Sequence, residues 1–488
     1  MRCETRISDT GCPTSRHHFG RAPPLREKLE RPFCRHRARA LLASSPMQVR
    51  TETPLHELSD GEVQILGAVH TVTGASLLVR FGEGRLLVDC GVAQGRDARD
   101  WEFPEASLSA DALLLTHGHN DHVGSIPELW RRGWQGPILG TRATLDIARL
   151  VVSDGLRLRR EREDVKPFER FFDQHARALP YDHMAPHLAG FPASFALREA
   201  GHILGSASVE LRSAQSRAIL SGDLGRRDVP ILRDPFTAWD DDMPVDLVLM
   251  ESTYSGRNHE SVPDEVEAKL LRVIEHVQRS GGHLLIPAFA IGRTQLLLYH
   301  LNSLVESGRV QDLPVAVDTP MGLEVTKLHD AHRTLFDLEA TKRLSMGDDP
   351  LNFDELYAVK KHKDSLRLRE TPGPMVILAG SGMCTGGRIV GHLQESLPDE
   401  RSAVLFVGYQ SPGTPGHAIQ HAKQHGGSVR LEGEDVEVNA HIATIDGLSA
   451  HAGHDELLAW LGAIPHVRAM GTYHGEPRAQ QALTAALA

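Results

Sequence analysis

The sequence predicts an α/β protein of two domains, and three observations support this class. An apolar run at residues 113–115 reads as a buried strand and stops abruptly before a cluster of metal-ligand side chains. Beyond about residue 255, the chain reads as repeated strand–helix units. Its 488 residues exceed one compact domain, and its 41% hydrophobic and 24% charged content is ordinary for a globular protein. We therefore expect one α/β domain with a second one inserted.

The first part of the chain differs in composition from the rest. Residues 1–55 show no sustained periodicity, and we expect a disordered N-terminal extension without a catalytic role, with Met47 as an alternative start. Residues 1–46 carry ten Arg and Lys against four Asp and Glu, so the remainder is more acidic than the total of −11. This balance counts mildly against a broad nucleic-acid-binding face. The sequence supports neither a secretory signal nor a membrane span. Five unevenly spaced cysteines indicate a reducing compartment, and we expect a cytoplasmic protein.

Strands and helices follow in a recognisable order. Short strands are expected at 63–66, 76–81 and 85–88, and a charged helical region from 130 to about 192. Later strands are expected at 283–286, 315–317, 375–378 and 403–407. A helical apolar stripe precedes them at Val266, Leu270, Ile274 and Val277.

The most informative segment follows the strand at 113–115. His117, His119, Asp121 and His122 lie within six residues. In a helix, His117 and His119 would point to nearly opposite faces, whereas on a tight loop all four side chains can converge. Imidazole and carboxylate are the donors that zinc and similar cations bind. The alternative is a polar loop that is rich in histidine by chance, in a chain with 28 histidines.

Three more positions become candidate functional residues once this histidine cluster is recognised. Asp89 ends the strand at 85–88, His202 lies between glycines, and Asp223 ends an apolar strand at 218–220. Alone, Asp89 would be read as a turn former and His202 as a core or turn histidine. With the histidine cluster, these segments resemble the metallo-β-lactamase fold, an αββα sandwich of hydrolases with two metals. The resemblance implies that Asp89 supports the metal-binding histidines from behind.

Residues after 255 resemble the β-CASP domain of nucleic-acid-processing members of that superfamily. The matching loops lie at 287–295, 317–321, 380–388 and 407–414. Glu251, His451 and His474 match the family's motifs A, B and C. The chain is most similar to compact bacterial ribonucleases, akin to the endonuclease subunit of the pre-mRNA 3′-end cleavage complex. This resemblance implies a metallo-β-lactamase domain at 56–255 and 444–488, with the β-CASP domain at 256–443.

The resemblance also implies the chemistry. It predicts two zinc ions, with manganese as the alternative, that activate a water for attack on RNA. One ion would bind His117, His119, His202 and Asp223; the other would bind Asp121, His122, Asp223 and His474. Asp121, Glu251 and His451 are the expected catalytic residues, with His451 as general acid held protonated by Glu251. The products would carry 3′-hydroxyl and 5′-phosphate ends.

RNA contacts are expected from Ser381, Thr385, Arg388 and Arg293, because glycine-rich loops and their donors suit phosphate. The alternative is that the glycine-rich loop at 380–388 binds no ligand and is only a turn between a strand and a helix. Tyr409 stacks on a base or packs inside. His474 favours RNA over DNA by analogy with the family. A cleft between two domains favours a single strand, and the oligomeric state is left open, with a homodimer among the alternatives. A hydrolase of DNA or of small esters or lactams, and a scaffolding member of an RNA-processing complex, are the competing hypotheses.

Overall fold

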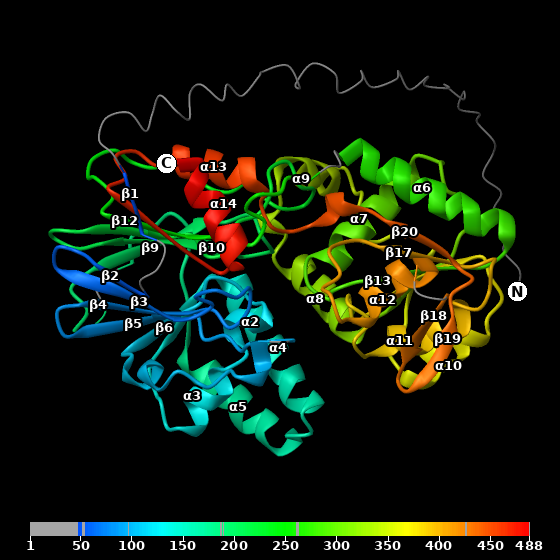
Figure 1. Cartoon of the computed structure of the whole chain (residues 1–488), viewed down its shortest axis with the longest axis horizontal. Helices are drawn as coiled ribbons and strands as arrows, with labels where there is room; N and C mark the ends of the chain where they lie inside the picture. The colour runs from blue at the N-terminus through cyan, green and yellow to red at the C-terminus, as the bar shows by residue number, and fades with distance from the viewer. Residues whose placement is uncertain are drawn as a thin grey trace, which may run out of the picture.

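The computed structural model describes residues 47–50, 54–95, 97–185, 188, 190–259, 263–424 and 427–487. One domain of the molecule, which contains strands β1 to β12 and β21, is built on two sheets that face each other (Figure 1). The seven-stranded sheet runs in sequence order from β2 to β8: Leu55–Glu57, Gly61–Gly67, Ser76–Phe81, Gly84–Val88, Ala112–Leu114, Ile138–Gly140 and Ala176–Ala178. The six-stranded sheet has the order β1-β21-β12-β11-β10-β9: Gln48–Arg50, Ala469–Tyr473, Leu247–Glu251, Arg217–Leu220, Ala207–Arg212 and Ser194–Glu199.

Each sheet of this sandwich is covered by helices on its outer side, which makes four layers. Val79, Leu86, Val209 and Leu249 belong to the core between the sheets. The outer side of the seven-stranded sheet packs on helices α2 to α5, at Asn120–Val123, Ile126–Arg131, Arg142–Leu158 and Arg162–His175. The six-stranded sheet packs on α13 (His454–Gly462) and α14 (Pro477–Leu487), through a core that includes Trp460.

The second half is an all-parallel sheet with helices on both faces (Figure 1). Its order is β15-β14-β16-β13-β17-β20: Leu356–Ala358, Val315–Asp318, Met375–Ala379, His283–Pro287, Ala403–Phe406 and His441–Thr444. The helices are α6 to α12: Pro263–Ser280, Arg293–Glu306, Pro320–Ala331, Leu338–Ser345, His362–Glu370, Arg388–Ser396 and Pro415–His421. A hairpin of β18 (Ser428–Leu431) and β19 (Glu434–Glu437) completes it. The predicted α6 stripe is buried at all four positions.

Two expectations about local structure need correction. We predicted a disordered extension through residue 55, but β1 pairs in parallel with β21 and so belongs to the sandwich. Residues 1–46 and 51–53 of that prediction lie outside the described residues. We also predicted a helical region from 130 to 192, which in fact contains β7 and β8 beside its helices. Strands of three residues are too short to show an alternating pattern, which is why β7 and β8 were missed.

The topology gathers loops from distant parts of the sequence at one edge of the sandwich. Strands β11, β12 and β21 are parallel neighbours, and β5, β6 and β7 are parallel in the other sheet. The carboxyl ends of parallel neighbours meet at the same edge. No helix in the described part of the chain is both long and apolar enough to pass through a bilayer.

Candidate metal centre

The histidine-rich loop begins where β6 ends and is held from behind by Asp89. The Asp89 carboxylate accepts hydrogen bonds from the Thr116 N–H (2.8 Å) and the Thr116 hydroxyl (2.7 Å). Its Oδ2 also lies 2.8 Å from His122 Nδ1. This contact leaves Nε2 of His122 to face the interior of the site. Asp89 has a φ of 62° and His474 a φ of 48°, left-handed conformations that Asp and His adopt more often than most residues with a side chain.

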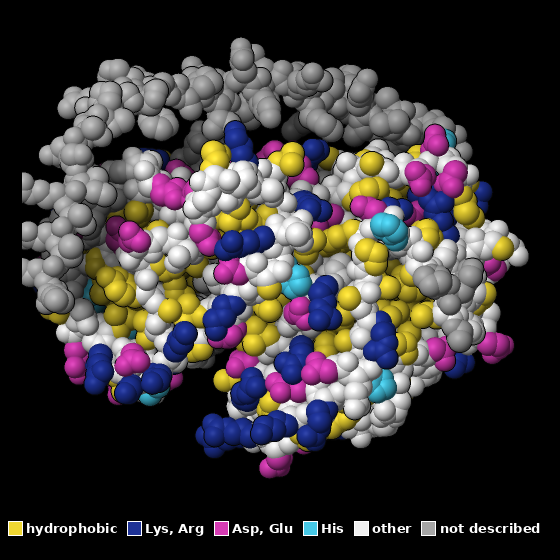
Figure 2. All heavy atoms as spheres, turned by 180° about the vertical axis from the view of Figure 1, so that it is seen from behind, with side chains coloured by type: hydrophobic (Ala, Val, Ile, Leu, Met, Phe, Trp, Pro, Cys, Tyr) yellow, Lys and Arg dark blue, Asp and Glu magenta, His cyan; other side chains and the backbone are white. Residues whose placement is uncertain are grey.

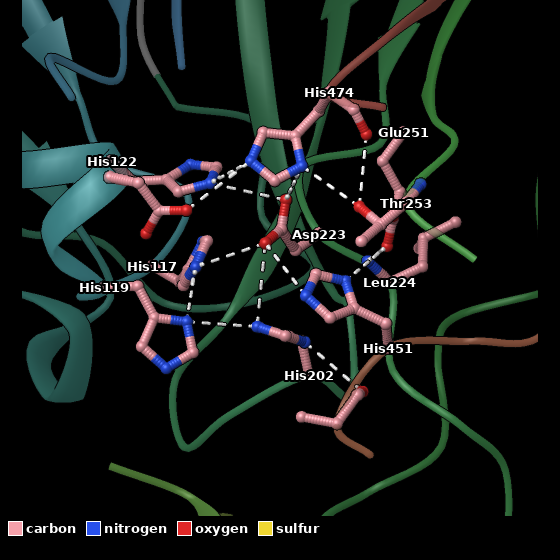
Figure 3. A network of polar contacts seen from close by, with 12 residues as sticks. His117, His119, His122, His202, Asp223, Leu224, Glu251, Thr253, His451 and His474 are labelled. Atoms are coloured by element: carbon pink, nitrogen blue, oxygen red, sulfur yellow. Dashed lines mark hydrogen bonds and ion pairs between the residues drawn. The ribbon is translucent and has the colours of Figure 1, made fainter. Parts of the chain in front are cut away.

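Three imidazoles and one carboxylate meet in a first set of donors (Figure 3). His119 Nδ1 lies 3.1 Å from Nε2 of His117 and 3.1 Å from Nε2 of His202. Asp223 Oδ2 lies 3.6 Å from each of the latter two nitrogens. The sequence separates His202 from His119 by 83 residues, and the loop between β9 and β10 closes that distance.

Asp121, His122 and His474 form the second set beside the first. Nε2 of His474 is 3.3 Å from Nε2 of His122 and 3.7 Å from Oδ2 of Asp121. The Asp223 carboxylate lies between the two sets, because its Oδ1 is 3.3 Å from Nε2 of His122. Figure 3 shows Asp223 at the centre of the histidines. All seven predicted metal ligands are therefore brought together.

The chemistry of these donors fits bound cations. Burial lowers the pKa of His117 and His202, and it lowers that of His119 to about 4, which keeps these rings neutral with free lone pairs. A neutral imidazole has only one N–H, so the converging nitrogens of three rings cannot all be satisfied by one another. Asp223 Oδ1 is buried and lacks a hydrogen-bond partner. Buried lone pairs without a proton donor are stabilised by a cation, and this donor set suits zinc.

His451 and Glu251 adjoin this centre on its other side (Figure 3). Glu251 is fully buried, and its Oε1 accepts a hydrogen bond from the Leu224 N–H and lies 3.1 Å from His451 Nδ1. His451 Nε2 is 3.9 Å from Asp223 Oδ2. Burial alone would lower the pKa of His451, but the carboxylates, Glu251 foremost, outweigh it and raise the pKa to about 8.

Thr253 is a further residue of the site, for which the sequence assigned no role. Its N–H donates to Glu251 Oε2 (3.0 Å), and its hydroxyl lies 3.2 Å from His474 Nδ1. Thr253 thus contacts members of both groups, Glu251 through its backbone N–H and His474 through its hydroxyl. The only sequence signal was its position two residues after Glu251.

The four predicted phosphate contacts have different surroundings. Ser381 Oγ accepts a hydrogen bond from the Thr385 N–H (3.0 Å) at the surface. Arg293 lines a small cavity next to His202, and its guanidinium stacks on the Phe289 ring at 4.9 Å. Among the described residues, Tyr254 rather than a carboxylate is the group whose charge acts on Arg293.

Arg388 makes several contacts within the protein, and its predicted phosphate contact stays a prediction. Its guanidinium donates to Asp318 (2.5 Å) and to the carbonyls of Val359 and Lys360 (2.9 Å each). His392 binds the other oxygen of Asp318 at 2.7 Å. These three hydrogen bonds of Arg388 therefore connect the glycine-rich loop at 380–388 to Asp318 and to the segment after β15.

Comparisons with known proteins agree with this architecture. Three domain models match successive segments: the metallo-beta-lactamase superfamily at residues 71–287, the Beta-Casp domain at 294–419, and the Zn-dependent metallo-hydrolase RNA specificity domain at 435–488. The predicted fold class is thereby confirmed.

Individual relatives cover most of the chain. Ribonuclease TTHA0252 of Thermus thermophilus is 38% identical over 86% of this chain and 95% of its own. Transcription termination factors FttA of Methanocaldococcus jannaschii and Pyrococcus abyssi are 30% and 31% identical over 85% of this chain, and 67% and 66% of theirs. A protein of unknown function from Enterococcus faecalis shares the fold at 12% identity, with a TM-score of 0.50 over 85% of this chain and 94% of its own. Because the Thermus relative is matched over nearly its whole length, and the domain models agree with the sheets and the donor sets, this chain belongs to the β-CASP ribonuclease family of metal-dependent hydrolases.

Proposed function

We propose that this protein is a ribonuclease that hydrolyses phosphodiester bonds of single-stranded RNA with two metal ions. The observation that carries the proposal is the bridging position of Asp223 between two sets of buried donors. The relatives named as a ribonuclease and as transcription termination factors support RNA as the substrate. Zinc is the proposed metal and manganese the alternative. Homodimer formation and the cytoplasmic location remain predictions.

The two donor sets support the division of ligands that the family resemblance implied. His117, His119, His202 and Asp223 would hold one ion, and Asp121, His122, Asp223 and His474 the other. Bound there, two cations supply a water of lowered pKa and positive charge for the developing phosphoryl transition state. Asp89 and Thr253 orient His122 and His474 by hydrogen bonds, so the ligand rings need little rearrangement.

His451 is the proposed general acid. Its Nε2 points towards Asp223 and the donor sets, while its Nδ1 faces Glu251. A proton held on Nε2 is therefore next to the reacting phosphate and can pass to the leaving 3′ oxygen. This direction of cleavage gives 3′-hydroxyl and 5′-phosphate ends.

Arg293 is the proposed phosphate contact nearest the centre, with Ser381 and Thr385 as further contacts. Burial lowers the pKa of the Arg293 guanidinium, which reflects a cation withdrawn from water. A desolvated cation without a carboxylate partner is costly, and an RNA phosphate would relieve that cost.

The direct test is a cleavage assay on purified, metal-loaded protein. We expect cleavage of a defined single-stranded RNA, with weak or absent cleavage of duplex RNA, single-stranded DNA and a chromogenic β-lactam. The Asp223→Asn variant should cleave none of them. Preference for DNA or the lactam would replace the proposal with the corresponding hydrolase. No cleavage alongside stoichiometric recovery of partner proteins would favour a scaffolding role.

A further inference from the structure

Three side chains are layered outward from His451. The Tyr254 ring is stacked on the His451 ring, with centroids 6.0 Å apart and planes 24° apart. The guanidinium carbon of Arg257 lies 5.5 Å from the Tyr254 centroid and 5.3 Å from that of Tyr409. Both distances are within the range of a cation–π contact. We call Tyr254, Arg257 and Tyr409 the aromatic ladder.

The ladder joins the two halves of the molecule. Tyr254 and Arg257 follow β12 of the sandwich, whereas Tyr409 follows β17 of the all-parallel sheet. The Arg257 backbone is fixed, because its N–H donates to the Tyr254 carbonyl and its carbonyl accepts from the His454 N–H. Beside Tyr409, the buried Gln410 donates to the Gly382 carbonyl at 3.0 Å. The ladder therefore rests on backbone that is held in place on both sides.

The outer end of the ladder is open to ligands. Tyr409 is 47% exposed, and Arg257 is exposed. Within the described part of the chain, no carboxylate pairs with Arg257. An exposed aromatic residue needs no explanation alone, but here it is stacked with an arginine and connected to the catalytic histidine. Tyrosine rings and guanidinium planes are the groups on which unpaired bases stack.

We infer that the aromatic ladder binds an unpaired base of the RNA on the 5′ side of the scissile phosphate. This inference rests on the proposed function, in which His451 protonates the 3′ oxygen of the upstream nucleotide. The ladder starts at His451, so the nucleotide that it meets is on that upstream side. In a duplex, the faces of each base are covered by its neighbours, and the strand cannot turn a base towards Tyr409. The ladder would therefore select single strands.

The charge of the protein favours base stacking, rather than general attraction to phosphate, as the main source of RNA affinity at the aromatic ladder. On the face drawn in Figure 2, Lys and Arg side chains are interspersed with Asp and Glu. The whole chain carries a formal charge of −11. Because the net charge is negative, we expect local stacking to contribute more of the affinity than general attraction to phosphate.

The test combines protein variants with abasic substrates. Metal-loaded wild type, Tyr409→Ala, Tyr409→Phe and Arg257→Ala would be assayed on one RNA cleaved at a defined bond, and on versions with a single abasic ribose at successive upstream positions. Tyr357→Ala is the matched control, because Tyr357 is an exposed tyrosine of the same sheet, on edge strand β15, at 56% exposure.

We expect Tyr409→Ala to lower kcat/KM roughly tenfold or more, mainly through KM, and Tyr409→Phe to retain near wild-type values. For wild type, one abasic position should cause a similar loss, and that loss should disappear in Tyr409→Ala. Equal sensitivity of both proteins at every abasic position, or an equal effect of Tyr357→Ala, would overturn the inference.

A binding measurement separates this inference from the proposed function. The His451→Ala protein would be titrated with the same RNA carrying the fluorescent base 2-aminopurine upstream. Stacking should quench its fluorescence, and Tyr409→Ala added to that protein should abolish the quenching. If quenching is observed but the wild-type protein cleaves no RNA, the proposed function is wrong and the stacking site still stands. The absence of quenching at every upstream position would remove the stacking site.

Discussion

His451 Nδ1 lies 3.1 Å from the Oε1 atom of the fully buried Glu251, and this contact turns the opposite ring nitrogen towards Asp223. A neutral or protonated imidazole with Nδ1–H can donate to this carboxylate, so Glu251 fixes both the orientation and the proton of His451. The pair sits outside both donor sets. Its removal should therefore affect proton transfer without removing a metal ligand.

Substitution His451→Ala should reduce RNA cleavage by about 10²- to 10⁴-fold, the usual contribution of a general acid. Metal content, measured by elemental analysis, should stay near two ions per chain. His362→Ala, at an exposed position on α10, is the matched control and should cleave as wild type does. Full cleavage by His451→Ala would exclude it as the proton donor.

Substitution Glu251→Gln should move the alkaline limit of cleavage to lower pH. Glu251 is the main group that raises the pKa of His451, to about 8, against the lowering effect of burial. The active form is protonated, so wild-type activity should fall as the pH rises through about 8, and the variant should lose its proton at lower pH. The measurement is kcat/KM against pH for both proteins. An unchanged alkaline limit would show that another group controls it.

Metal content should distinguish Asp223 from Asp121. Asp223 adjoins both donor sets, whereas Asp121 belongs to only one. We expect Asp223→Asn to retain close to no metal and Asp121→Asn to retain close to one ion per chain after dialysis. Addition of a chelator to wild type should abolish cleavage, and zinc or manganese should restore it. Two ions retained by Asp223→Asn would contradict the bridging role.

Glu199 should make the protein progressively less stable as the pH rises from 4.5 to about 8. Burial raises the pKa of its carboxyl from 4.5 to about 8, although the Gly201 N–H donates to it at 3.1 Å. Between these values the folded protein keeps a proton that the unfolded chain releases, so stability falls by about 1.4 kcal/mol per pH unit as the pH rises. Glu199→Gln should be more stable than wild type at pH 8 and equal to it below pH 4.5 in urea unfolding. Glu83→Gln, at an exposed position, should show no such difference.

Four of the proposed metal ligands were predictable because they are close together in the sequence. His117, His119, Asp121 and His122 occupy one loop, and a buried strand in front of them indicates where that loop lies. The strands Ser76–Phe81 and Gly84–Val88 were also anticipated closely, because buried apolar runs bounded by turns are distinctive. The distant ligands His202, Asp223 and His474 were found through the family resemblance.

Features that depend on long-range pairing were not predictable. The partner of Arg388 is Asp318, 70 residues earlier and at the end of the neighbouring strand β14. A glycine-rich loop with an arginine looks the same in sequence whether that arginine faces a phosphate or a buried carboxylate. Strand β1 is defined only by its pairing with β21, near the other end of the chain. The sequence could not decide whether Tyr409 stacks on a base or packs inside, because its exposure depends on both halves of the molecule.

Strand β21 also has a consequence for synthesis of the protein in the cell. It is inserted between β1 and β12, and it carries His474 to the centre after the whole all-parallel sheet has been translated. While the ribosome is still making that sheet, the emerging polypeptide lacks His474 and the strand that pairs with both β1 and β12. The second donor set can therefore be completed only after the all-parallel sheet has been synthesised.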